Sequence, residues 1–504
     1  MGRTIFNANV DGEFRLKTQF HTVENKEHLI HGDIILENGT IFIEIFDQFQ
    51  EHSSLFGSNL SEFKRLYGNT HEGELITLFD LRQINLKYGY PGFPIKRYIV
   101  GSVLSGYVEN DDADVYDSVK VDFTYLEKWL ACSMLKENIE SDGDKGRARF
   151  PIEVINPNLF SVECCISGQN VTIEPDLSLT CETKSYYEKE FRQNTFLKII
   201  PDEPKNLNWY KKMVSDLQNL FTLLIGQPIM IKRFEIKADN NWGVYFSKQN
   251  QIKTREQFFE WDVFINYHDI SEKFESVLNN WFEKEKTMKN INNLLVGNFY
   301  LNQYQQNIFL NYMQGLEGLH RLAFKGTYMS KSKFKKESKK VREFIKENMD
   351  WEDSVIKSVT ERISYAYEYS LNDRLQDLIN HLNEKSRELI IGTKQEIEEF
   401  IKEIKKLRNK LTHPDELDSN ESDEENIAIK FYELNQQLKI IFMIFLLKEL
   451  GVSEDALIKK LENNRHYNHI LKKNNEKLDE IFLSLEETLK IKEQIEKFES
   501  ENEQ

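Results

Sequence analysis

Residues 31–46 read HGDIILENGTIFIEIF, a pattern typical of two β-strands joined by a short turn. Two apolar runs, 34–36 and 41–46, flank the pair Asn38-Gly39. Asn-Gly between such runs strongly favours a tight hairpin, because both residues readily adopt positive φ. Further β-like runs of the first half cover residues 14–20, 98–108, 119–125, 170–173 and 229–236. We therefore predict a β-rich first half that is interrupted by one helix, over residues 209–224.

The helix-breaking residues are distributed unevenly along the 504 residues. Eight of the nine prolines lie between Pro91 and Pro228, and sixteen of the 22 glycines precede residue 250. The second half carries apolar residues at three- and four-residue spacing, which is typical of amphipathic helices. These predicted helices cover residues 271–296, 303–324, 355–383, 395–411, 425–450 and 478–498. We predict an α+β multidomain protein, with a β-rich domain at 1–265 and an all-α helical bundle at 266–504.

Charge and composition exclude several classes of protein. The chain has 66 Lys and Arg against 83 Asp and Glu, a net charge of −17, so nucleic acid or anionic lipid must find a local basic patch. The longest apolar run, 440–447, is too short to span a bilayer, and the start lacks the apolar stretch of a signal peptide. The four cysteines are Cys132, Cys164, Cys165 and Cys181. They contain no CxxC pair, so we expect a cytoplasmic protein without a disulfide framework and without a membrane partner.

The sequence also lacks the common cofactor and hydrolase motifs. GxxxxGK[ST], GxGxxG after a strand, HExxH and GxSxG are all absent. His466 and His469 have the spacing of metal ligands, but no nearby cysteine or third histidine completes a site, so an exposed turn is the better interpretation. We predict neither a cofactor nor a metal ion.

The predicted helix 395–411 has a charged residue on its apolar side. Its apolar positions are Ile397, Phe400, Ile401, Ile404, Leu407 and Leu411. Arg408 falls in the same stripe, and because an unpaired buried charge is unfavourable, it needs a carboxylate, a cleft or an anionic ligand. Asn409 follows it, and His413 precedes Pro414, which ends the helix. Carbonyl groups at a helix C-terminus favour the imidazolium form, so His413 can exchange protons near neutral pH.

Arg408 and His413 together have the chemistry for cleaving RNA without a metal. The reaction needs a base for the 2′-hydroxyl, positive charge beside the phosphorus, and an acid for the leaving 5′-oxygen. A guanidinium can hold two phosphate oxygens at once. The two residues lie roughly 140° apart around an ideal helix, so one helix alone makes a poor site. Two such helices crossing at a twofold axis would supply two histidines, and we therefore expect a dimer.

The residues alone leave three alternatives open. Arg374 and His381 show a similar spacing, an arginine followed by four to six residues and a histidine, although Leu375 follows that arginine. Glu317, on a neighbouring helix, could neutralise Arg408 without any catalysis. A histidine before proline could be only a cap that bonds the last carbonyls of its helix.

Several segments resemble a known family along nearly the whole chain. HGDIILENGTIFIEIF (31–46), ITLFDLRQINL (76–86) and VKVDFTYLEKWL (119–130) are similar to the N-terminal domain of the ApeA family of bacterial anti-phage proteins. IFLNYMQGLEGLHRLAF (308–324), LNDRLQDLI (371–379) and RNKLTH (408–413) resemble the HEPN ribonuclease domain that ends those proteins. The last segment fits the HEPN signature, in which arginine, often followed by a polar residue, precedes a histidine.

This resemblance implies a toxic, metal-independent endoribonuclease that causes abortive infection. It assigns Arg408, Asn409 and His413 as the nuclease residues, with Glu317 as a weaker candidate for a supporting acid. It implies RNA as substrate, with tRNA as the expected kind, a homodimer or higher homo-oligomer, and a phage-derived protein trigger that the N-terminal domain senses. The alternative from another class is a non-catalytic sensor or adaptor that binds nucleotide, RNA or a protein partner.

Two charge-biased stretches lie in the helical half. Residues 321–346 hold ten basic residues and two acidic ones, a local balance of +8. We predict that Lys335, Lys336, Lys339 and Lys340 bind RNA there, with a solvated helix face or loop as the equal alternative. Residues 415–425 hold seven acids and no base, and we predict that they screen the nuclease site in the resting state.

Overall fold

The computed structural model describes most of the chain. The described residues are 13–22, 25–46, 62–87, 95–106, 115–137, 140–142, 147–149, 152–157, 159–166, 168–238, 241–247, 252, 255, 257–324, 326–412, 421–464 and 467. The chain divides into two compact units, Met1–Glu283 and Lys284–Gln504. That division falls within helix α4 (Phe274–Tyr300), and the domain boundary that the sequence suggests, at residue 265, stays a prediction.

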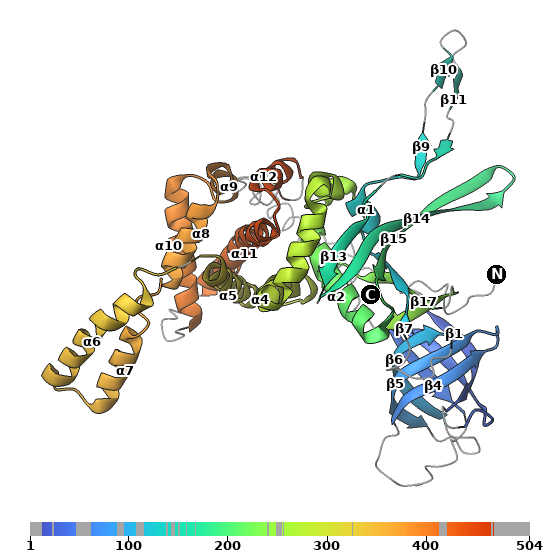
Figure 1. Cartoon of the computed structure of the whole chain (residues 1–504), viewed down its shortest axis with the longest axis horizontal. Helices are drawn as coiled ribbons and strands as arrows, with labels where there is room; N and C mark the ends of the chain where they lie inside the picture. Colours follow the sequence, from blue (N-terminus) through green and yellow to red (C-terminus); the bar gives the residue numbers. More distant parts are fainter. Residues whose placement is uncertain are drawn as a thin grey trace, which may run out of the picture. The chain divides into compact units, whose positions relative to one another are not determined.

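The first six strands close into an antiparallel barrel (Figure 1). They are β1 (Phe14–His21), β2 (Ile30–Glu37), β3 (Thr40–Ile45), β4 (Glu62–Thr70), β5 (Leu75–Lys87) and β6 (Ile95–Ser105). Their order is β6-β3-β2-β1-β4-β5, and β5 returns to pair with β6, which closes the ring. The predicted hairpin is confirmed: Glu37 pairs with Thr40, and Asn38 and Gly39 have φ of 49° and 68° in the turn between them. Alternate residues of these strands point inward and form one apolar core, which includes Phe20, Ile34 and Ile43.

The rest of the first unit extends the sheet beyond the barrel, where β18 pairs with β6. Its strands are β7 (Val115–Tyr116), β8 (Ser118–Phe123), β9 (Leu135–Glu137), β10 (Glu140–Asp142), β11 (Arg147–Arg149), β12 (Ile152–Val154), β13 (Val162–Ile166), β14 (Gln169–Ser185), β15 (Glu188–Pro201), β16 (Lys205–Asn206), β17 (Ile231–Ala238) and β18 (Asn241–Ser247). Between them lie α1 (Leu126–Leu130) and α2 (Leu207–Ile225), the helix predicted over 209–224. The side chain of Asn206 caps the start of α2, and Gly226 ends it at φ 77°.

Strands β14 and β15 form a long two-stranded arm. In its inner part, β15 pairs with β8 and alternate side chains are buried. The side chains of its outer part are almost all exposed. At the tip, Tyr186 and Tyr187 are each 93% exposed, and their rings contact each other edge to face. The arm therefore presents two aromatic rings that contribute nothing to the core of this unit.

The second unit is helical, as the sequence predicts (Figure 1). Its helices, with those that precede it, are η2 (Glu260–Asp262), α3 (Tyr267–Ile270), η3 (Ser271–Lys273), α4 (Phe274–Tyr300), α5 (Gln305–Ala323), α6 (Lys331–Asn348), α7 (Asp353–Ile363), α8 (Leu371–His381), α9 (Glu384–Ile390), α10 (Lys394–Thr412), α11 (Glu421–Glu449) and α12 (Glu454–Asn463). Helices α5 and α11 pack closely at Gly315, where an added Cβ would lie 2.3 Å from the ring of Phe442. The predicted helix 478–498 lies outside the described residues. In the part of the chain that the structure describes, no helix is long and apolar enough to cross a membrane.

One predicted helix, 355–383, is wrong as a single element. The structure divides it into α7 and α8, with a turn over residues 364–370 between them. The side chain of Ser370 accepts a hydrogen bond from the backbone N–H of Asp373 and forms a capping box that starts α8. Glu368 in the turn also pairs with Thr327 in a β-bridge. The helical spacing of the sequence continues across this turn, but the cap and the bridge interrupt the helix.

Candidate functional site

Helix α10 buries the apolar stripe that the sequence predicts. Phe400, Ile401, Ile404 and Leu407 are each at most 6% exposed. The opposite side of the helix is lined with lysine and glutamate side chains that face solvent. The helix is therefore fixed by its packed side, and residues near its C-terminal end are held at the border between core and solvent.

Arg408 and Asn409 lie in the last two turns of α10, and both are half-buried. This partial burial fits the prediction that Arg408 occupies a position of the apolar stripe. His413 lies just beyond α10 and outside the described residues, so its distance from Arg408 stays a prediction. Residues 415–420 of the acidic stretch also lie outside the described residues, and the backbone of 421–425 begins α11.

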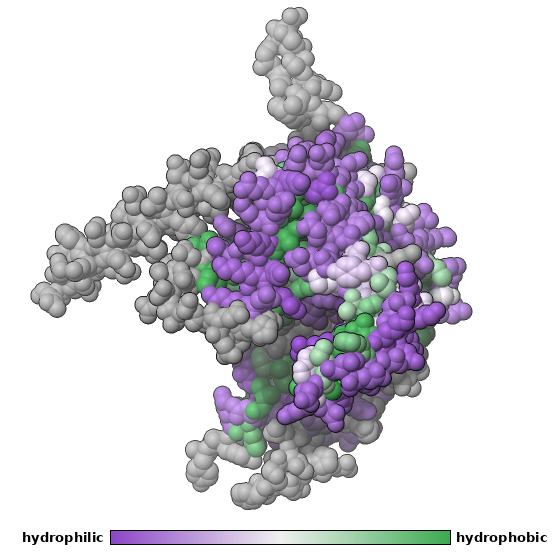
Figure 2. Space-filling view, turned by 90° about the vertical axis from the view of Figure 1, so that its left-hand side faces the viewer, coloured by the Kyte–Doolittle hydropathy of each residue, from purple (hydrophilic) through white to green (hydrophobic). Residues whose placement is uncertain are grey.

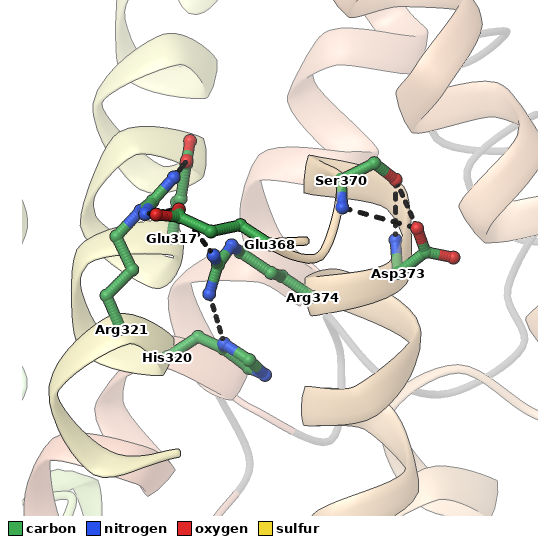
Figure 3. Close-up of polar contacts among 7 residues, drawn as sticks. All are labelled: Glu317, His320, Arg321, Glu368, Ser370, Asp373 and Arg374. Atoms are coloured by element: carbon green, nitrogen blue, oxygen red, sulfur yellow. Dashed lines mark hydrogen bonds and ion pairs between the residues drawn. The ribbon is translucent and has the colours of Figure 1, made fainter. Parts of the chain in front are cut away.

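Glu317, the predicted supporting acid, belongs to a polar network between α5 and α8 (Figure 3). Its carboxylate accepts a hydrogen bond from Arg321, at 3.0 Å between Oε1 and Nη2. Arg321 also pairs with Glu368, and this ion pair lowers the pKa of the Glu368 carboxyl. Glu368 then accepts from Arg374 at 3.3 Å, so one carboxylate joins two arginines.

Arg374 is the buried centre of this network. The whole residue is 2% exposed, and burial lowers the pKa of its guanidinium. Besides Glu368, its Nη1 contacts Nδ1 of His320 at 3.1 Å, while its Nε finds no acceptor among the described residues. A buried cation with these few partners is expensive to desolvate and stays in place only because the surrounding helices hold it. The guanidinium is thus engaged inside the protein.

The contacts of His320 determine its tautomer. A guanidinium has only N–H donors, so Nδ1 of His320 accepts from Arg374 and the ring proton is on Nε2. Nε2 donates to Oδ2 of Asp377 at 2.8 Å. The ring is completely buried, and burial lowers the pKa of His320; the charge of Arg374 acts in the same direction, whereas Asp377 opposes it. His320 is therefore a neutral link between an arginine and an aspartate.

Gly326 lets the backbone between α5 and α6 pack directly against Arg374 and His320. Its φ of 52° lies in the left-handed region, which a residue with a Cβ adopts only with strain. A Cβ built there would lie 2.4 Å from Nη1 of Arg374 and 2.7 Å from Cε1 of His320. The backbone oxygen of Gly326 accepts from the N–H of Tyr369 in the turn before α8. The chain between α5 and α6 therefore covers the network directly with its backbone.

The two residues of the alternative pair, Arg374 and His381, lie in different surroundings. The His381 side chain is 45% exposed, its Nδ1 lies 2.7 Å from the backbone oxygen of Asp377, and its ring packs on Phe324. Arg374 instead points into the protein toward His320. The geometry gives this arginine a structural role in joining α5 to α8.

The four predicted RNA-binding lysines, Lys335, Lys336, Lys339 and Lys340, all lie on helix α6 and are exposed. Helices α6 and α7 pack as a hairpin that projects from the rest of the helical unit (Figure 1). The face of the molecule in Figure 2 is largely hydrophilic, with smaller hydrophobic areas between. Among the described residues, no group of three or more His, Cys, Asp or Glu side chains could hold a metal ion.

The buried network is what sequence reasoning missed. The sequence suggests Arg374 only as the arginine of the alternative spacing, and no motif marks His320. Both lie in amphipathic helices at positions that apolar residues also occupy. The two residues bond to each other although they are 54 positions apart in the chain. No local pattern marks such a pair, since the charges are matched only when α5 and α8 pack together.

Comparisons with known proteins agree with a β-rich first part and a helical second part of the chain. The model of ApeA N-terminal domain 1 matches residues 11–281, and the model of the Apea-like HEPN domain matches residues 310–456. No curated protein and no solved structure matches the chain. HEPN domains are generally ribonucleases, so the second match indicates a ribonuclease-type or nucleotide-related function in anti-phage defence. Since the first match alone covers more than half of the chain, this protein belongs to the ApeA family, with a β-rich N-terminal domain followed by an Apea-like HEPN domain.

Proposed function

We propose that this protein is an anti-phage effector that cleaves RNA without a metal ion, through Arg408, Asn409 and His413. All three residues fall within the part of the chain that matches the HEPN domain. They match the arginine, polar residue and histidine of the HEPN signature in order and in spacing. We further propose tRNA as the substrate and the cytoplasm as the place of action.

The observation that carries this proposal is the different burial of the two arginines with suitable spacing. Arg408 is half-buried near the end of α10, so part of it faces solvent. Arg374 is 2% exposed and bonded to His320 and Glu368. A phosphate must reach the guanidinium to be bound, so Arg408 is the better candidate of the two.

In the proposed mechanism, Arg408 holds two phosphate oxygens and stabilises the charge that develops on the pentacoordinate phosphorus. His413 removes the proton from the 2′-hydroxyl, which attacks the adjacent phosphorus and displaces the 5′-oxygen. A second His413, from another copy of the chain, gives a proton to that leaving oxygen. Asn409 orients the phosphate or the imidazole. The products are a 2′,3′-cyclic phosphate end and a 5′-hydroxyl end.

The other parts of the chain have supporting roles in this proposal. Glu317 acts through Arg321 on the packing of α5 and not on the substrate, because its carboxylate is held in the network of Figure 3. Exposed basic residues on one side of α6, Lys339 among them, hold the RNA. The N-terminal domain senses a phage-derived protein, and that event releases the nuclease in a homodimer or larger assembly, which leads to abortive infection.

The test is an RNase assay of the purified full chain in the presence of a chelator. We expect Arg408→Ala and His413→Ala each to lower the cleavage rate by at least about 100-fold, since general acid–base and charge-stabilising groups each contribute on this order. The products of the wild-type chain should carry 2′,3′-cyclic phosphates. The matched control is His381→Ala, which removes an exposed histidine of the same domain and should leave the rate unchanged.

Three outcomes contradict the proposal. Cleavage by His413→Ala at the wild-type rate, under conditions in which the chain forms dimers, removes the histidine from the mechanism. Loss of cleavage in His381→Ala together with full activity in Arg408→Ala moves the site to α8. RNA or nucleotide binding without any cleavage by the wild-type chain supports the alternative, a non-catalytic sensor or adaptor.

We propose that the acidic stretch 415–425 restrains the nuclease at rest. It follows His413 directly, and its seven carboxylates repel RNA phosphates. Replacing its acidic residues with Asn and Gln should raise basal cleavage in the absence of infection. Basal cleavage that stays the same in this variant would contradict autoinhibition and leave the catalytic proposal intact.

A further inference from the structure

The hairpin of α6 and α7 contains a groove of about 440 Å³ between its two helices. On the α6 side, Lys339, Arg342 and Lys346 line it, and the Glu343 carboxylate lies between them. Their spacing of three and four residues puts them in one row along the helix, about 10 Å long at 1.5 Å per residue. The α6 side of the groove therefore carries three cationic donors, in a row longer than a single phosphate group, together with one carboxylate.

The α7 side of the groove is chemically different. Thr360, Glu361 and Ser364 line it. The hydroxyl of Thr360 already donates to the backbone oxygen of Ile356, and that of Ser364 donates to the backbone oxygen of Thr360. Both hydroxyl oxygens and the Glu361 carboxylate can therefore only accept hydrogen bonds from a ligand. The three cations of α6 donate, and the groups on the α7 side accept.

Two charged groups of the groove have no partner in the part of the chain that the structure describes. Neither Lys346 nor the Glu361 carboxylate forms a hydrogen bond or ion pair there, whereas Lys339 pairs weakly with Glu343 at 3.6 Å. Arg342 is half-buried, and its guanidinium donates to the backbone oxygen of Ser338 at 3.3 Å. This hydrogen bond keeps the Arg342 side chain along α6, at the edge of the groove.

We propose that this groove binds the sugar–phosphate backbone of RNA, an inference that rests on the ribonuclease function proposed above. Phosphates carry only acceptors and match the three cations of α6. Ribose 2′-hydroxyls carry donors and match the wall of α7, which predicts a preference for RNA over DNA, since DNA lacks that hydroxyl. The length of the cationic row suits a strand with successive phosphates better than one isolated phosphate.

Helix α6 provides its own matched control. Lys336 and Lys340 are exposed on the same helix but do not line the groove. Replacing Lys336 and Lys340 with Gln removes the same charge as replacing Lys339 and Lys346. All four side chains are exposed, so neither double variant should affect folding.

The experiment measures binding of labelled single-stranded RNA, and of DNA of the same sequence, to the full chain with His413→Ala, which prevents cleavage during the measurement. In that background, K339Q/K346Q should weaken RNA binding by at least about tenfold and reduce the salt dependence by about two phosphate contacts. K336Q/K340Q should weaken it by less than about threefold. Glu361→Ala should reduce the ratio of RNA to DNA affinity.

Equal effects of the two double variants, or a larger effect of K336Q/K340Q, overturn the groove and leave only a general electrostatic attraction to α6. An unchanged RNA-to-DNA ratio in Glu361→Ala overturns recognition of the 2′-hydroxyl. If millimolar ATP displaces the RNA, the groove binds a free nucleotide, and this result contradicts the RNA backbone as its ligand. Groove-dependent binding by a wild-type chain that cuts no RNA contradicts the proposed function, whereas cleavage with groove-independent binding contradicts this inference alone.

Discussion

Arg374 donates a hydrogen bond to Nδ1 of His320 at 3.1 Å, and both side chains are almost completely buried. The two residues come from α8 and α5, and the carboxylates of Glu368 and Asp377 stand at either end of the pair. Loss of either residue would leave the other buried without this hydrogen-bond partner. The pair therefore joins the two helices strongly and makes the HEPN domain sensitive to the loss of either residue.

The first prediction concerns the difference between a buried and an exposed arginine of the same network. Arg374→Met should lower the free energy of unfolding by about 1–3 kcal/mol, because it leaves the buried Nδ1 of His320 without a hydrogen-bond donor. Arg321→Met removes a side chain that is 47% exposed and should lower it by at most about 1 kcal/mol. Urea denaturation followed by the helical circular dichroism signal measures both. Equal losses in the two variants would contradict the burial of Arg374.

The second prediction concerns pH. Burial lowers the pKa of His320 in the folded chain, so the unfolded chain binds this proton first as the pH falls. The stabilisation is complete above the ordinary pKa of 6.5 and is lost as the pH falls through the lower folded value. Denaturation curves between neutral and mildly acidic pH should show this loss. His320→Gln keeps an acceptor and a donor but cannot take a proton, so its stability should vary less; the same slope in both chains would show that other groups titrate there.

The third prediction tests the close approach of Gly326 to the network. Gly326→Ala should lower the free energy of unfolding by at least about 2 kcal/mol, because it combines a left-handed backbone with overpacking against Arg374 and His320. The matched control is Gly297→Ala in α4, where an added Cβ meets nothing within 4 Å. That change should stabilise the helix by about 0.5–1 kcal/mol. Thermal unfolding distinguishes the two signs, and a stable Gly326→Ala chain would mean that the backbone does not cover Arg374 this closely.

The fourth prediction concerns the tip of the β14–β15 arm. The double change Tyr186→Ser and Tyr187→Ser should alter the free energy of unfolding by at most about 0.5 kcal/mol, because both rings are 93% exposed. Tyr210→Phe is the contrasting change in the same unit. It removes a buried hydroxyl that donates to the backbone oxygen of Tyr116 at 2.9 Å and should lower the stability by about 1–3 kcal/mol. A marked loss in the double variant would show that the tip packs on another part of the chain.

Much of the architecture follows from local patterns. Asn38-Gly39 selects a tight turn by its backbone preferences alone, and the structure has that turn between β2 and β3. The apolar stripe of α10 is likewise visible as a spacing of three and four residues, and its four central residues, from Phe400 to Leu407, are buried. Such features depend on neighbours within one turn or one helix, so the printed sequence is sufficient to predict them.

Closure of the barrel and the buried network depend instead on residues far apart in the chain. Strand β6 pairs with both β3 and β5, a choice that no local pattern contains. The interval 364–370 looks helical by spacing, yet Glu368 leaves the helix to meet Arg321 and Arg374. Burial of His320 and Arg374 is favourable only once each has the other as a partner, because an isolated buried charge or polar ring is too costly. The sequence by itself determined the strands, the helices and the candidate nuclease residues; tertiary packing alone decided which arginine became part of the core.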